Sequence, residues 1–525
     1  MRGIALLVVI LAALANASEA NAHASLIRSE PADRAVVAQP PPQLTLTFNE
    51  PVSPVALRLV RPSGEVIELN DIALRGATFA VALPAGLSRG THLLSWRVIS
   101  ADSHPVFGTL AFSVGQPSDR PSALAQTDGD IRLRGAIWTA RLVLYLALFT
   151  GVGGAFYCRW IAAAPPSGSI RGAVNVALGC GLVAALLSAG LHGVDVLGVP
   201  PSAIRQSHTW VSGLGTAYGL TLGLAAAALA LGLAANATNG KLARWCAALA
   251  LAGVGFALAA SGHAATAGPE WATRPALFLH GVSVAFWVGA LWPLAAALRA
   301  NDGRSDLPRF SKASPWPLAA LVVSGLLLAV VQVQRLNALW MTAYGMVLSA
   351  KLVAVCALLA LAAMNRRSTP RVAAGDAAAT RRLVRSIRIE LAIVFVILGL
   401  VATWRFTPPP RSLQAIAAQP IHVHIHGDKA MADLKIEPGR SSGRRITVNL
   451  LDGEFRPLSA KEVVLFLFKP DAGIEPLRLP TARAEATIWQ SDDVSLPISG
   501  RWHVRVEILI SDFEKLTLED EIEFR

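Results

Sequence analysis

Histidines gather at three places in this sequence, and neutral imidazole is a common ligand of transition metals. The first place includes His263 and His280, at the edge of an apolar run where an ionisable group is costly. Pro275 suits the first turn of a helix, and the run from Ala276 to Leu298 is long enough to cross a bilayer. At about 1.5 Å per residue, His280 would lie about 8 Å inside that span.

His192 extends this set to three histidines from three apolar runs. It lies at the exit of the second run, His263 lies at the exit of the fourth, and His280 lies just inside the fifth. Three imidazoles at one depth predict a site that receives a metal ion, and copper suits such ligands. Asp195, one turn beyond His192, could orient that ring or join the site. The alternative is that each histidine reaches the membrane interface or satisfies a helix end alone.

Residues 1–22 have the features of a secretory signal peptide. Arg2 precedes an apolar run from Ile4 to Ala15, and the cleavage pattern Ala20-Asn-Ala22 follows. The apolar run is too short to be a good membrane span. Cleavage after Ala22 would make His23 the first residue, and its free α-amine and imidazole could then chelate one metal ion.

The second place combines His23 with Asp102 and His104. Asp102 and His104 are two residues apart, so both side chains point to one face of an extended chain. Amine and imidazole nitrogens with one carboxylate suit a tetragonal Cu(II) site. The alternative is that His104 is a turn histidine before Pro105 and that His23 is an ordinary chain end.

The third place is the alternating series His422, His424 and His426. Alternation points three imidazoles to one face of a strand, which suits a second docking site for metal, with Met431 as a further candidate. A solvated strand face is the alternative. The remaining histidines His92, His208 and His503 lie alone and are interpreted as structural.

Composition predicts an integral membrane protein with soluble ends. Of the 525 residues, 53% are hydrophobic and 16% are charged, and the apolar residues form one central block. The net charge of +12 comes from Lys and Arg in short loops, so it indicates topology and no nucleic-acid partner. The four cysteines provide neither a disulfide framework nor a CxxC metal site, and the five methionines do not cluster.

The central block, residues 136–405, is predicted to be a bundle of eight transmembrane helices. The apolar runs lie near 136–161, 173–194, 211–235, 243–262, 275–298, 315–334, 344–364 and 386–405. Lys and Arg gather after the first, third, fifth and seventh runs. These loops are therefore predicted to be cytoplasmic, which places both soluble ends on the periplasmic side of the membrane.

The two soluble ends are predicted to be β-sandwiches. Residues 23–115 and 421–525 contain short alternating runs separated by turn residues, such as the run from Gln43 to Phe48. A polar linker is expected over 116–135 and a Pro-rich linker over 406–420. The fold class is thus a β-sandwich, a helical membrane bundle and a second β-sandwich.

Several stretches of the first domain resemble the periplasmic copper-binding CopC family over essentially its whole length. They are His23-Ala-Ser-Leu26, Ser29-Glu-Pro-Ala32, Phe48-Asn-Glu-Pro-Val52 and the run from Ser95 to Gly108. The resemblance implies that His23, Asp102 and His104 hold Cu(II), with Glu50 as a lesser candidate. Ser103 stands where glycine is common, and the Met-rich Cu(I) segment of some members is absent.

The membrane block resembles CopD, the multispanning partner of CopC, and the last domain loosely resembles YtkA-like sandwiches. The CopD-like stretches are Arg309-Phe-Ser-Lys-Ala313, Ser324-Gly325, Ala343 to Lys351 and Asn365-Arg366, with Ser261-Gly-His-Ala264 and Leu279-His280 upstream. The resemblance implies copper passage across the bacterial inner membrane, for uptake or for tolerance. Lys351, in the middle of the seventh run, could pair with a backbone carbonyl or with Glu390, either as a structural ion pair or with a role in transport.

The predicted function is capture of periplasmic Cu(II) by the first domain and transport of copper through the bundle. The sequence has no G-x-x-x-x-G-K-[ST] pattern, nucleophile elbow or CPx motif, so neither ATP-driven pumping nor hydrolytic catalysis is expected. One alternative is a haem- or copper-dependent membrane oxidoreductase, although haem bundles often use histidines on both sides of the membrane. Another alternative is a periplasmic copper buffer without transport.

Overall fold

The computed structural model describes residues 24, 26–33, 35–101, 103–116, 118, 131–300, 303–407, 409–411, 420–427, 429–438, 443–454, 456–494 and 500–524. The predicted signal peptide, His23 and Asp102 lie outside these residues. The chain forms two compact units. One unit contains the helices together with residues 101–104, and the other contains the two β domains, which are described separately below.

The N-terminal domain is a β-sandwich, as its alternating runs predict. One sheet has the strand order β1-β3-β7-β6 and the other has the order β2-β9-β8-β4-β5, in which β2 and β9 are parallel. Alternate residues face the core, where Leu44, Leu46 and Phe48 of β3 are buried. The strands are β1 (Leu26–Glu30), β2 (Ala35–Val37), β3 (Gln43–Phe48), β4 (Ser53–Val60), β5 (Val66–Glu68), β6 (Ile72–Arg75), β7 (Thr78–Ala82), β8 (Gly90–Ile99) and β9 (Pro105–Val114).

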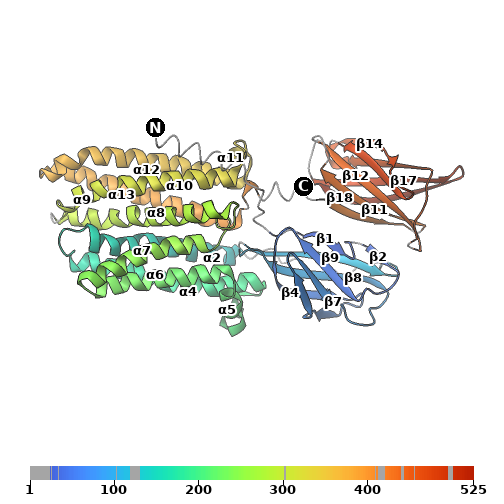
Figure 1. The fold of residues 1–525 in the computed structure, drawn as a ribbon, viewed down its shortest axis with the longest axis horizontal. Helices are drawn as coiled ribbons and strands as arrows, with labels where there is room; N and C mark the ends of the chain where they lie inside the picture. Colours follow the sequence, from blue (N-terminus) through green and yellow to red (C-terminus); the bar gives the residue numbers. More distant parts are fainter. Residues whose placement is uncertain are drawn as a thin grey trace. The chain divides into compact units, whose positions relative to one another are not determined.

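The central block contains eight described helices that are long and apolar enough to cross a membrane, in agreement with the eight predicted runs. Figure 1 shows these helices side by side in a bundle. The helical segments are α2 (Ile131–Leu146), η1 (Ala147–Val152), α3 (Gly153–Phe156), η2 (Tyr157–Ile161), α4 (Gly168–Leu197), η3 (Pro201–Arg205), α5 (Ser207–Leu214), α6 (Ala217–Ala237), α7 (Gly240–Ala260), α8 (Glu270–Arg299), α9 (Asp306–Ala313), α10 (Pro315–Val333), α11 (Ala338–Met341), α12 (Ala343–Ala373), α13 (Ala377–Thr403) and η4 (Trp404–Phe406).

Successive spans alternate in direction along the bundle. The first span consists of segments α2 to η2. The other spans are α4, α6, α7, α8, α9 together with α10, α12, and α13 together with η4. An even number of spans brings the start of α2 and the end of η4 to the same end of the bundle. We call it the domain end, because the chain continues from there into the two β domains.

Several helix boundaries differ from the predicted runs, and two of the differences have a visible local cause. Helix α8 begins at Glu270 instead of Pro275, so that Pro275 lies inside the helix. The predicted third run is divided between α5 and α6, because the Thr216 side chain accepts a hydrogen bond from the Gly219 amide and caps a new helix. Hydropathy identified these spans, but it does not reveal local caps or a tolerated proline.

Helix α8 is the central element of the bundle. It packs against α3, α7, α10 and α13, and more of it is buried than of any other described span. Its approach to α3 is so close that a Cβ added at Gly153 would lie 1.8 Å from the Ala285 carbonyl oxygen. Glycine at this crossing allows two helix backbones to come into direct contact.

The C-terminal domain is also a β-sandwich. Its sheets have the orders β10-β11-β12-β16-β15 and β14-β13-β17-β18, and Trp502 is fully buried in its core. The segments are β10 (Ile421–His426), β11 (Ala430–Pro438), β12 (Arg444–Asp452), β13 (Glu462–Lys469), η5 (Pro470–Ala472), β14 (Ile474–Pro480), β15 (Ala482–Arg483), β16 (Ile488–Val494), β17 (Gly500–Ser511) and β18 (Glu514–Phe524).

Candidate metal centre

The rings of His104 and His263 lie together within the compact unit that contains the helices. His104 ends the loop between β8 and β9, and His263 belongs to the loop between α7 and α8. The rings are stacked, with centroids 4.3 Å apart and an interplanar angle of 9°. An imidazole lone pair lies in the plane of its ring, so one ion cannot bind both rings in this orientation. One ring would have to turn before both could bind the same ion.

The backbone conformation at position 103 explains why glycine is common there in the CopC-like pattern. Ser103 has a φ of +70°, in the left-handed region that favours glycine, and glycine is the residue common at this position in the CopC-like pattern. His104 and Glu50 are both buried. Because His23 and Asp102 lie outside the described residues, the N-terminal Cu(II) site stays a prediction.

Two polar residues that the sequence did not single out fix the backbone at His263. The His263 carbonyl oxygen accepts hydrogen bonds from Gln332 Nε2 at 3.0 Å and from Arg411 Nη2 at 2.8 Å. Arg411 Nε also donates to Gln332 Oε1 at 3.0 Å. Gln332 and Arg411 are both buried, so this network holds the His263 loop against α10. The sequence feature that could have identified Gln332 is a glutamine at the end of an apolar run.

His280 lies on α8 and makes a hydrogen bond that identifies its protonated nitrogen. The Ser324 hydroxyl donates to the Leu321 carbonyl at 3.1 Å, so its oxygen must accept from His280 Nδ1, which is 3.2 Å away. His280 Nε2 therefore keeps a lone pair for a metal ion. A Cβ added at Gly325 would lie 3.2 Å from His280 Cε1, so glycine there leaves room for the ring.

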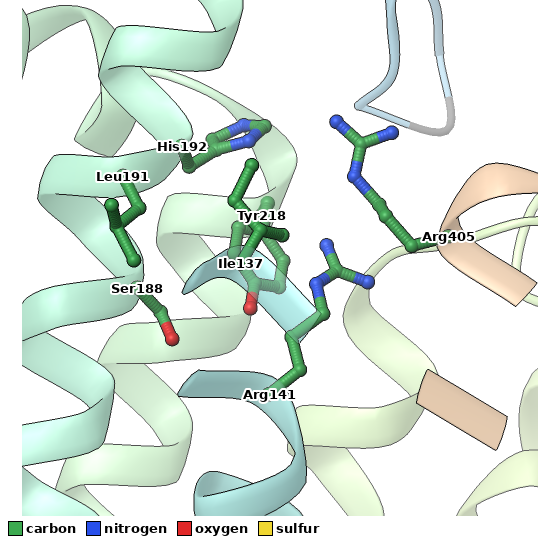
Figure 2. Close-up of a pocket in the computed structure, with 7 residues that line it drawn as sticks. All are labelled: Ile137, Arg141, Ser188, Leu191, His192, Tyr218 and Arg405. Atoms are coloured by element: carbon green, nitrogen blue, oxygen red, sulfur yellow. The ribbon is translucent and has the colours of Figure 1, made fainter. Parts of the chain in front are cut away.

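His192 has a different environment. The Thr216 hydroxyl donates to the Gly213 carbonyl at 3.0 Å, so it accepts from His192 Nε2 at 3.2 Å. Arg141 and Arg405 line the same small pocket as His192, as Figure 2 shows. Two guanidinium groups repel a bare metal cation, which makes this pocket unfavourable for copper. Asp195, which the sequence offered as a residue that could orient His192 or join its site, pairs with Arg405.

The structure places His192, His263 and His280 toward the domain end but does not join them into one site. Within the described part of the chain, no three His, Cys, Asp or Glu side chains lie together as a metal ion would require. Each histidine is held by its own local contacts. Helix α8 begins five residues earlier than predicted, so His280 lies ten residues, or about 15 Å, from the helix start.

Lys351 and Glu390 do not form the ion pair that was considered for them. The Lys351 ammonium lies over the Trp404 ring, 4.8 Å from its centroid, and Tyr344 stacks on the same ring. Glu390 instead accepts a hydrogen bond from Asn365. A cation on an aromatic face is a stable alternative to a salt bridge inside an apolar bundle.

His422, His424 and His426 lie on strand β10, as predicted. Their partners across the strand pair are Lys435, Asp433 and Met431. His424 is buried, its Nδ1 pairs with Asp433, and its Nε2 has no hydrogen-bond partner. Partial burial and the charge of Lys435 lower the pKa of His422, which keeps its imidazole neutral to a lower pH.

The three lone histidines have ordinary surroundings. His92 is fully buried and donates from Nε2 to the Ser88 carbonyl at 2.8 Å, and burial lowers its pKa. His208 is exposed at the start of α5, and His503 stacks on Phe468. These positions are consistent with structural roles.

Comparison with known proteins gives two family matches. The CopC domain model matches residues 26–115, and the model for copper resistance protein D matches residues 304–404. The copper transport protein CutJ of Bacillus subtilis (strain 168) is 24% identical over 536 residues, covering 95% of this chain and 95% of that protein. Copper resistance protein C of Xanthomonas campestris pv. juglandis is 36% identical over 123 residues, covering 22% of this chain and 96% of that protein.

Two solved structures also match part of the chain. CopC from Methylosinus trichosporium OB3b is 24% identical and covers 19% of this chain and 98% of its own, with a TM-score of 0.17. PcoC from Escherichia coli, a methionine-rich copper resistance protein, is 24% identical and covers 18% of this chain and 99% of its own, with a TM-score of 0.16. The resemblance of the C-terminal domain to YtkA-like sandwiches stays a prediction.

Proposed function

We propose that this chain binds periplasmic Cu(II) and transports copper inward across the bacterial inner membrane. The chain belongs to the CopC family through its N-terminal domain, and its bundle carries a copper resistance protein D domain. The observation that carries this proposal is the contact between the His104 and His263 rings. It links a residue of the predicted Cu(II) site to a residue of the predicted transmembrane set.

The first step is capture of Cu(II) by the N-terminal domain. Its ligands are His23, Asp102 and His104, with Glu50 as a further candidate. Nitrogen and carboxylate ligands in this combination favour Cu(II) over other divalent ions. Rotation of the His104 or His263 ring then lets His263 replace one of the first ligands, so that the ion moves without becoming fully hydrated.

The second step carries copper from His263 to His280. The support for His280 is its Nε2 lone pair, which the hydrogen bond from Nδ1 to Ser324 leaves available. An oriented imidazole on a rigid helix is a stronger ligand than a freely rotating one. His192 is the weakest of the three transmembrane candidates, because Arg141 and Arg405 line its pocket.

The C-terminal domain supplies a second docking site for copper on β10. Its central ligand is His424, whose Nδ1 is engaged by Asp433 while its Nε2 is unpartnered. A carboxylate behind an imidazole is the arrangement that supports metal-binding histidines. His422 and His426, two residues away on either side, would have to turn toward His424 to complete the site, because no three such side chains among the described residues lie together as a metal ion requires.

Copper accumulation in cells tests the proposed transport. The His280→Ala variant should reduce accumulation to the level of cells that lack the protein, because it removes the nitrogen ligand that receives copper from His263. The exposed His208→Ala variant, which lies near the same end of the bundle, is the control and should accumulate copper normally. The membrane content of each variant is measured in parallel.

The same variants separate the alternatives. Unchanged accumulation with His280→Ala, at equal membrane content, would contradict transport through His280. Full copper tolerance with His280→Ala would favour a periplasmic buffer, since binding by the N-terminal domain would then suffice. A Soret band in the purified chain would favour the oxidoreductase.

A further inference from the structure

An apolar groove lies on the outside of the bundle, between helices α12 and α13, which pack against each other (Figure 1). Eight apolar residues line it, four from each helix, and four of the eight are alanines, whose short side chains keep it open. Its volume is about 400 Å³, within the range of sites that bind small molecules. Ala357, Ile389 and Ala392 of the lining are exposed. An exposed apolar surface on a membrane span is covered by lipid or by another protein.

Two arginines at one end of this groove indicate which of the two covers it. Arg385 and Arg388 precede Ile389 and Ala392 of the lining by four residues each. Residues four apart lie on the same face of a helix, about 6 Å apart along its axis, so both arginines continue the face of the groove away from the domain end. Both arginines are exposed. The groove is therefore apolar along its length and positively charged at one end.

The acidic residues of these two helices are engaged elsewhere. Helices α12 and α13 and the turn between them contain only two acidic residues, Asp376 and Glu390. Glu390 is buried and accepts a hydrogen bond from Asn365, and Asp376 caps α13 by accepting from two backbone amides. Among the residues that the structure describes, no carboxylate forms an ion pair with Arg385 or Arg388. An anion bound at this end of the groove would therefore meet two guanidinium groups without competition from a carboxylate.

We propose that this groove binds one anionic phospholipid, with its phosphate at Arg385 and Arg388 and part of an acyl chain along the alanines. A phospholipid joins an anionic phosphate to an apolar chain, which is the order of charged and apolar surface along α13. Arginine binds phosphate through paired hydrogen bonds, and basic residues near the membrane surface attract anionic lipids. A second copy related by a two-fold axis along the membrane normal would bring the arginines of both copies together, so repulsion between like charges opposes that occupant. The lipid site does not depend on copper transport.

Native mass spectrometry of the purified full chain in detergent tests this site. The chain is titrated with phosphatidylglycerol or with phosphatidylcholine of the same acyl chains, and the fraction of the chain that carries one lipid is measured. Wild type should bind the first phosphatidylglycerol saturably and more tightly than phosphatidylcholine, whose headgroup has no net charge. Arg385→Gln and Arg388→Gln should each weaken phosphatidylglycerol binding roughly fivefold. Ala357→Phe should weaken the binding of both lipids, because its ring fills the groove.

Two matched controls should bind both lipids as wild type does. Arg244→Gln removes an exposed arginine of α7 at the same end of the bundle, and Ala363→Phe adds a ring at an exposed position of α12 outside the groove lining. If Ala357→Phe does not fold, the arginine variants and the wild-type titrations still decide the question.

Equal binding of the two lipids by wild type would overturn the proposal, and so would unchanged phosphatidylglycerol binding in both arginine variants. A dimer of the chain that is lost in Ala357→Phe would assign the groove to a second copy and would also overturn it. Displacement of phosphatidylglycerol by an equal concentration of inorganic phosphate would have the same consequence, because the groove would then contribute nothing to binding.

Discussion

At the scale of single residues, the partner of one imidazole nitrogen determines whether the other nitrogen can bind a metal ion. Ser324 engages Nδ1 of His280, Thr216 engages Nε2 of His192, and Asp433 engages Nδ1 of His424. In each case the opposite nitrogen keeps its lone pair. The sequence identified the histidines because their residue type and spacing are visible. It did not reveal that Ser324, noted only within a CopD-like stretch, engages His280, or that Thr216 engages His192, since these partners lie 44 and 24 residues away.

The β10 site gives a prediction at this scale. Asp433→Asn should weaken Cu(II) binding at His424 about tenfold, because an amide supports the imidazole less well than a carboxylate does. His424→Ala should remove this binding. Cu(II) titration of the full chain is done in a His104→Ala background, which disables the N-terminal site. His503→Ala, a variant of a partly exposed histidine in the same domain, is the control. Equal affinity in all these chains would contradict a copper site on β10.

At the scale of elements, apolar length predicted the bundle well. Eight runs of sufficient hydropathy correspond to the eight candidate spans among the described residues, because the bilayer sets the length of a span. The start of α8 was missed, since Pro275 is accommodated within the helix. The crossing of α3 and α8 was also missed, because glycines that allow close contact between helices cannot be paired from one sequence.

That crossing can be tested with two glycine substitutions. A Cβ added at Gly289 would lie 2.3 Å from the Gly153 Cα, and backbone atoms cannot move aside as a flexible side chain would. Gly289→Ala should lower the free energy of unfolding by about 1–3 kcal/mol, as overpacking does. At Gly223 on α6, an added Cβ meets nothing within 4 Å, so Gly223→Ala should be neutral or stabilising. Thermal unfolding in detergent measures both, and equal destabilisation would contradict the close crossing.

At the scale of the whole molecule, the bundle can have only two orientations in the membrane, because successive spans alternate in direction. Helix α12 has 31 residues and is about 46 Å long, whereas the hydrocarbon core is about 30 Å thick. Its arginine-bearing last turns therefore extend beyond the core, at the end opposite the domain end. The excess of positive charge there supports a cytoplasmic location for that end and a periplasmic location for both β domains.

Cysteine labelling of intact spheroplasts tests this orientation. All four native cysteines are first replaced by serine. A single cysteine is then introduced at Ser202 in η3 or at Ala374 between α12 and α13, and both positions are exposed. A membrane-impermeant maleimide should label Ser202→Cys in intact spheroplasts, whereas Ala374→Cys should react only after the membrane is opened. The reverse pattern would place the N-terminal copper domain in the cytoplasm. Capture of Cu(II) from the periplasm would then be impossible, and the direction of the His104 to His263 transfer would have to be assigned anew.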